Sequence, residues 1–235
     1  MSTTAGPVRP VYLLLDTSGS TARGGFADGR DQAMPLVVDQ AARHGGLALA
    51  VLMYGTRADT LVWLGDPADI KLIPVVRPGG LSSLAAGLRL LADSVRADIA
   101  RLTADGVGCL PPAVLIVADG LPTDEVGALL DARADLAAAL TDTGGSPPPL
   151  FAVPAATDRL AVAGLRMGFY PLDTATPATL AWSVRGAFDR LLAGGAGEFR
   201  RRPAGAAFRC PSAYRRPCGR RLMERRAMGK PPSGR

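Results

Sequence analysis

One stretch, Val11–Ser20, constrains the fold more than any other part of this 235-residue chain. Five consecutive apolar residues, Val11 to Leu15, run directly into Asp16, and hydroxyl side chains follow at Ser18 and Ser20. A continuous apolar run of this length predicts a strand buried on both faces, as in the parallel sheets of α/β proteins. Open α/β sheets bind ligands beyond the carboxyl ends of their strands, so these polar residues stand where a site is expected.

The same pattern occurs a second time, because the apolar run Ala113–Ala118 also ends on an acid, Asp119. Packing alone gives no reason for two buried strands that each finish in an aspartate. In a parallel sheet the carboxyl ends of neighbouring strands share one edge. We therefore expect Asp16 and Asp119 to lie on the same edge of the sheet.

Hydrophobic periodicity predicts an alternation of strands and helices along the rest of the chain. Strands are expected at about 11–16, 47–54, 60–64, 113–118, 150–153 and 167–172. Helices are expected at about 31–43, 84–102, 125–140, 158–163 and 177–193. In the helix at 31–43, Asp31 is the expected N-cap and Pro35 lies near the first turn, and residues 21–30 are expected to form a loop.

The order of these elements predicts a doubly wound α/β fold with helices on both faces of a mostly parallel six-stranded sheet. The connection before residues 60–64 is too short for a parallel crossover, so this strand is expected to be an antiparallel edge strand. The remaining polar and aromatic side chains have ordinary structural interpretations. His44 is expected at a helix C-terminus, Asp124 and Glu125 in the first turn of a helix, and Trp63 and Trp182 in core or edge packing.

Charge divides the chain into two parts. Residues 1–196 hold 15 basic and 19 acidic side chains, whereas residues 197–235 hold 12 basic and 2 acidic side chains. The glycine-rich run 194–197 marks the boundary, and the segment beyond it shows no hydrophobic period. We expect one folded domain over 1–196 and a basic, disordered tail over 197–235.

Composition also limits the environment of the protein. No apolar run approaches the roughly 18 residues that span a bilayer, and residues 1–10 lack the apolar core of a secretory signal. The three cysteines, Cys109, Cys210 and Cys218, form no CxxC pair and cannot all be bridged within one chain. A reducing, cytoplasmic location is expected.

The chemistry of the first motif is that of a hard-metal site. Asp16, Ser18 and Ser20 are spaced at i, i+2 and i+4, which lets a turning loop direct three oxygen ligands at one centre. A carboxylate with hydroxyls suits Mg²⁺ or Mn²⁺. Several other site classes are excluded, since an EF-hand would need a glycine at Thr21 and a glutamate at Ala27. The chain likewise has no P-loop, nucleophile elbow or HExxH motif.

Three motifs in order resemble those of the von Willebrand factor A domain. They are Asp16–Ser20, Ser82–Leu88 and Asp119–Asp124, and the resemblance covers roughly residues 8–193. Within that family the chain is most similar to bacterial TerY-type proteins of tellurite-resistance and stress-response operons. This similarity rests on the sequence of the opening strand and on Leu172–Thr174, which precedes a last helix that carries Trp182. The resemblance implies a metal-ion-dependent adhesion site (MIDAS), which binds a divalent metal, Mg²⁺ first and Mn²⁺ or Ca²⁺ as alternatives.

Carried over by position, the metal site implied by the resemblance consists of five residues: Asp16, Ser18, Ser20, Ser82 and Asp119. Ser82 stands where the family usually has threonine, and Ser83 would serve if the loop were shifted by one residue. In the family the last coordination position is left for an acidic group of a partner protein. The implied function is that of a non-enzymatic adaptor, with kinases or phosphatases of the same operons as candidate partners.

Two other functions remain open. A Mg²⁺-dependent phosphotransfer or hydrolytic enzyme could use Asp16 as nucleophile or ligand, although the sequence places no second acid, lysine or histidine to move a proton there. A nucleic-acid-associated protein could act through the basic tail, but that tail has little aromatic interleaving beyond Phe199, Phe208 and Tyr214.

Overall fold

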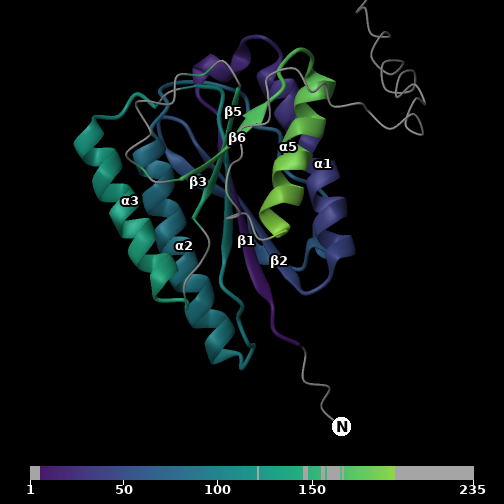
Figure 1. The fold of residues 1–235 in the computed structure, drawn as a ribbon, viewed down its shortest axis with the longest axis vertical. Helices are drawn as coiled ribbons and strands as arrows, with labels where there is room; N and C mark the ends of the chain where they lie inside the picture. The colour runs from purple at the N-terminus through teal and green to yellow at the C-terminus, as the bar shows by residue number, and fades with distance from the viewer. Residues whose placement is uncertain are drawn as a thin grey trace, which may run out of the picture. The chain divides into compact units, whose positions relative to one another are not determined.

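The computed structural model describes residues 6–120, 122–144, 148–154, 157, 165 and 167–193. Within these ranges the chain forms a six-stranded sheet in the order β3-β2-β1-β4-β5-β6 (Figure 1). The strands are β1 (Arg9–Asp16), β2 (Leu47–Tyr54), β3 (Ala58–Gly65), β4 (Ala113–Val117), β5 (Leu150–Pro154) and β6 (Gly168–Leu172). Neighbouring strands are parallel except for the antiparallel pair β2 and β3, which confirms the predicted sheet.

Helices cover both faces of the sheet. They are α1 (Phe26–His44), α2 (Leu84–Ala104), α3 (Val126–Thr141) and α5 (Pro177–Leu192), with short 3-10 turns at η1 (Gly19–Ala22) and η2 (Pro67–Asp69). Helices α2 and α3 lie on one face and α1 and α5 on the other (Figure 1). Because side chains alternate along a strand, Leu14 of β1 enters the core under α2 while Leu13 enters the core under α1.

Most of the predicted helices agree with the observed bounds. Helix α2 begins at Leu84, and its apolar stripe is buried against the sheet as the periodicity predicts. The helix expected at about 158–163 and the tail at 197–235 lie outside the described residues. None of the helices that the structure describes is long and apolar enough to cross a membrane.

Helix α1 differs from the prediction at its start. It begins at Phe26, five residues before the expected start, and the residue before it is Gly25 with φ of 73°. Glycine adopts this left-handed conformation without steric cost, so the chain turns directly into the helix. Asp31 is therefore a helical residue and not the N-cap, and Pro35 lies in the third turn.

Candidate metal centre

The centre of the sheet is where the direction of strand order reverses. Strand β1 has β2 on one side and β4 on the other, and both pairs are parallel. The register places Asp16 opposite Tyr54 of β2, and Leu15 opposite Val117 of β4. Asp16 and Asp119 therefore emerge on one edge of the sheet beside the reversal point, where doubly wound sheets bind ligands.

The first loop after β1 is organised by the Asp16 carboxylate. Its Oδ1 accepts a 2.8 Å hydrogen bond from the backbone amide of Ser18, which turns the chain back toward the strand end. The hydroxyl oxygens of Ser18 and Ser20 lie 3.0 Å apart in a hydrogen bond. The Ser20 hydroxyl also donates to Oδ1 of Asp119 over 3.2 Å. The four residues Asp16, Ser18, Ser20 and Asp119 thus form one connected group.

Ser82 joins this group from the segment that precedes α2. Its hydroxyl donates to Oδ2 of Asp16 over 3.1 Å, and only 5% of the residue is exposed. Backbone contacts hold it in place, because the amide of Thr123 donates to the Ser82 carbonyl and the amide of Ser82 donates to the Thr123 hydroxyl. The structure therefore brings together all five side chains that the sequence singled out.

Ser83 has a different role from its neighbour. It is the N-cap of α2, and its hydroxyl accepts a hydrogen bond from the amide of Ala86 while it donates to Oδ1 of Asp124 over 2.7 Å. Asp124 also accepts from the amide of Ala85. Asp124 was expected in the first turn of α3, but it stabilises the start of α2 instead, and Glu125 is the residue at the N-cap of α3.

Burial makes negative charge at this site energetically costly. Asp16 is fully buried, and among the described residues its carboxylate forms no ion pair. Burial, followed by the nearby negative charge of Asp16, raises the pKa of Asp119 above its ordinary value. A buried carboxylate next to a second carboxylate is costly without a compensating cation. Ser20 is exposed, so the group is open to solvent on that side.

The donor set fits a hard divalent cation. In the described part of the chain no group of three or more His, Cys, Asp or Glu side chains is placed to hold a metal. A cation here would instead depend on two carboxylates and three hydroxyls, an all-oxygen set that suits Mg²⁺, Mn²⁺ or Ca²⁺. Three hydroxyls bring no charge, so an incoming anion would complete the neutralisation of the metal.

Solved structures with similar architecture come from several sources. A von Willebrand factor type A protein from Catenulispora acidiphila is 18% identical with a TM-score of 0.56, over 79% of this chain and 43% of that one. The ArnB paralog VWA2 from Sulfolobus acidocaldarius is 12% identical with a TM-score of 0.51, over 75% and 45%. The pilus adhesin SpaC from Lactobacillus rhamnosus GG is 15% identical with a TM-score of 0.58, over 82% and 32%.

The chain has the von Willebrand factor A fold. It spans less than half the length of each of these three solved structures. The sequence matches no family model and no curated protein. At these sequence identities the likeness establishes the fold and leaves the activity to be argued from the site.

Two residues that support the site in this von Willebrand A fold were not predicted from the sequence. The hydroxyl of Tyr54 donates to Oδ2 of Asp16 over 3.2 Å, and burial together with Asp16 raises the pKa of Tyr54. Its position at the end of β2 was a usable signal, since β2 pairs with β1 in full register.

Arg30 is the second missed residue. Only 1% of it is exposed, and its Nη1 donates to the backbone carbonyl of Asp16 over 2.7 Å. Its Nη2 donates to the carbonyl of Val76 over 3.2 Å, and Asp31 lies 2.8 Å away as its ion-pair partner. No signal for this role was visible once residues 21–30 were interpreted as a loop.

The segment between η2 and α2 is attached to the loop after β1 by backbone hydrogen bonds. The amide of Gly79 donates to the Thr17 carbonyl over 2.9 Å, and the amide of Gly19 donates to the Gly80 carbonyl over 3.0 Å. Gly80 has φ of 72°, and a Cβ there would lie 2.0 Å from the hydroxyl of Thr56. A residue larger than glycine would therefore be strained at this approach.

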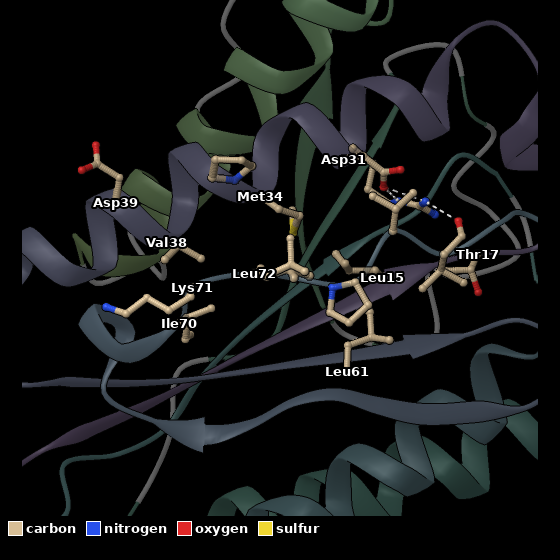
Figure 2. Close-up of a pocket in the computed structure, with 16 residues that line it drawn as sticks. Leu15, Thr17, Asp31, Met34, Val38, Asp39, Leu61, Ile70, Lys71 and Leu72 are labelled. Carbon is tan, nitrogen blue, oxygen red and sulfur yellow. Dashed lines mark hydrogen bonds and ion pairs between the residues drawn. The ribbon is translucent and has the colours of Figure 1, made fainter. Parts of the chain in front are cut away.

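A separate cavity of about 390 Å³ lies between α1, β3 and the earlier part of the same segment (Figure 2). Leu15, Met34, Val38, Leu61 and Ile70 are among its apolar lining residues. None of the five candidate metal ligands lines it, although Thr17 and Arg30 do.

The other residues whose roles were predicted from the sequence lie mostly outside this site. His44 is exposed in the last turn of α1, as expected. Trp63 was expected to pack but is 78% exposed on the edge strand β3, so that prediction is wrong. An edge strand has a neighbour on one side only, which leaves its side chains less covered. Trp182 is half-buried, with the Arg185 guanidinium 5.0 Å from the centre of its ring.

Proposed function

We propose that this protein is a metal-ion-dependent protein-interaction module, in which a divalent cation held by Asp16, Ser18, Ser20, Ser82 and Asp119 binds an acidic side chain of a partner protein. The observation that carries the proposal is the fully buried Asp16 carboxylate, which has no cationic partner among the described residues. A divalent cation would supply the missing positive charge, and Mg²⁺ is the expected ion.

Binding is proposed in preference to catalysis because of where the protein's proton-transfer groups lie. The chain has one histidine, His44, at the end of α1. Helix α1 follows β1 and returns across the sheet, so its end lies away from the candidate metal edge (Figure 1). The Arg30 guanidinium donates to the backbone carbonyl of Asp16, and an arginine side chain offers donors but no acceptor for a proton.

The cellular setting is proposed from the sequence resemblance to TerY-type proteins. We infer a cytoplasmic adaptor in a bacterial tellurite-resistance or stress-response system, with kinases or phosphatases among the candidate partners. Nucleic-acid binding through the basic tail is the alternative for residues 197–235.

The first experiment measures metal binding and partner capture separately. Mn²⁺ binding to the full chain is followed by electron paramagnetic resonance, and capture of proteins from the native cell is compared with and without chelator. Asp16→Asn should abolish both, because it removes the charge with little change of shape. Asp28→Asn, at an exposed acid in the first turn of α1, is the matched control and should change neither.

Each result has a distinct meaning. Retained partner capture by Asp16→Asn would contradict the metal-dependent mechanism. Metal-dependent hydrolysis of p-nitrophenyl phosphate that disappears in Asp16→Asn would favour the enzyme alternative instead.

A further inference from the structure

The cavity beside α1 is a hollow that opens to the surface next to the core under that helix. Its volume of about 390 Å³ falls in the range of small-molecule sites, which runs from roughly 300 to 1,000 Å³. Figure 2 shows Leu61, Leu72 and Val38 lying around one hollow, with Lys71 and Asp39 toward one end and Thr17 and Asp31 toward the other. The hollow is open to solvent on the side of the segment 70–76, where Leu72 and Val75 are largely exposed.

The side chains over the cavity are unusually exposed for their type. Leu72 is 78% exposed and Val75 is 74% exposed, although both line the cavity. Large apolar side chains left in water on a hollow surface are typical of a site that a ligand covers.

The charges around the cavity cancel, with one exception. Asp31 is paired with Arg30 at 2.8 Å, and Asp39 is paired with Arg43 at 2.7 Å. Lys71 forms no ion pair with any residue that the structure describes, and its ammonium donates to the carbonyl of Ala68 over 2.9 Å. An apolar cavity with one uncompensated cation is complementary to a molecule with an apolar body and one negative group.

We propose that this cavity binds a small amphipathic anion, with its apolar body between α1 and the segment 70–76 and its anionic group at Lys71. A medium-chain carboxylate has the required chemistry. The site is separate from the candidate metal centre, because none of the five candidate metal ligands lines the cavity. A test of this proposal is therefore independent of whether the candidate metal centre binds a metal.

A matched pair of fluorescent probes tests both parts of the proposal on the full chain. 8-Anilinonaphthalene-1-sulfonate (ANS) and N-phenyl-1-naphthylamine (NPN) share one ring system, and only ANS carries a negative group. ANS should bind saturably at one site per chain, and decanoate should displace it. NPN should bind about two- to fivefold more weakly, which is the size expected from an exposed ion pair.

Two variants locate the binding. Lys71→Gln should weaken ANS about two- to fivefold and leave NPN unchanged. Leu72→Asp should abolish binding of both probes, because it places a charge in the cavity wall. Val126→Asp is the matched control, since Val126 is a 63% exposed apolar residue at the start of α3, outside the cavity, and this variant should bind both probes as the parent does.

Other outcomes would overturn the proposal. Equal loss in Leu72→Asp and Val126→Asp, or no saturable binding of ANS, would show that the cavity is not a ligand site. Equal affinity for ANS and NPN, or an ANS affinity unchanged by Lys71→Gln, would remove the anionic group from the ligand. Thermal unfolding of each variant ensures that the comparison is made between folded proteins.

Discussion

Two halves of one segment, the connection between β3 and α2, behave in opposite ways. The half from Val76 to Ser83 is tied to the end of β1 by Arg30, by two backbone hydrogen bonds and by Ser82. In the half from Ile70 to Val75, which lines the cavity, Leu72 and Val75 are largely exposed, whereas Ile70 and Ile73 are partly buried against the core under α1. Both halves lack helix or strand, so regular structure does not cause the difference.

The difference arises because one half covers polar groups that need hydrogen bonds and the other covers apolar surface. Buried polar groups need hydrogen-bond partners. The backbone of Gly79 and Gly80 supplies such partners to the loop after Asp16. The apolar half has no such directional requirement, because burial of apolar surface is not directional. A hydrogen-bonded half and a largely apolar half therefore follow from the chemistry of the surfaces that they cover. The following predictions test this contrast from the largest effect to the smallest.

The largest effect is expected from Arg30→Met. This change removes a buried charge that bonds the carbonyls of Asp16 and Val76, and it leaves Asp31 without its partner. We expect the free energy of unfolding to fall by about 3–5 kcal/mol, measured by urea denaturation. Arg43→Met is the control, since its pair with Asp39 is exposed and should change stability by no more than about 0.5 kcal/mol. Similar losses in both variants would mean that the segment is not held through Arg30.

Ser82→Ala and Ser83→Ala should separate metal binding from helix capping. Ser82→Ala removes the hydroxyl that bonds Asp16, and we expect Mn²⁺ affinity to fall by about 10- to 100-fold. Ser83→Ala removes the N-cap of α2, which should lower stability by about 1 kcal/mol and leave Mn²⁺ affinity unchanged. The reverse pattern would place Ser83 at the metal.

Gly80→Ala tests the close approach in the hydrogen-bonded half. The left-handed backbone and the contact with Thr56 should together lower stability by about 1–2 kcal/mol, seen as a lower thermal midpoint. Gly79→Ala is the neighbouring control, because a Cβ there meets nothing within 4 Å. Equal midpoints for the two variants would show that the turn is not constrained.

The smallest effect on stability is expected in the open half. Leu72→Asp should change the free energy of unfolding by no more than about 0.5 kcal/mol, because 78% of Leu72 is already exposed. A loss of several kcal/mol, measured by the same urea denaturation, would mean that this half contributes to stability as much as the other and that the contrast between them is wrong.

Local patterns explain why so much of this fold was predictable. The strand Leu47–Tyr54 and the helix that begins at Leu84 agree with the sequence interpretation, since each is marked by an apolar run or stripe with glycine or serine at its boundary. The start of α1 was missed because Gly25 has a left-handed conformation that its neighbours do not reveal. The exposure of Trp63 was missed because the covering of an edge strand depends on distant segments.

The sequence by itself determined which residues stand at the ends of buried strands, because hydrophobic runs and their polar ends are local properties of the chain. Asp16, Ser18, Ser20 and Asp119 were found in this way, and the order of the motifs added Ser82. Only the tertiary structure decided that Ser82 and not Ser83 bonds Asp16, and that Tyr54 and Arg30 support it. These contacts join residues 14 to 66 positions apart, and they exist only once strand register and loop closure bring the backbone segments together.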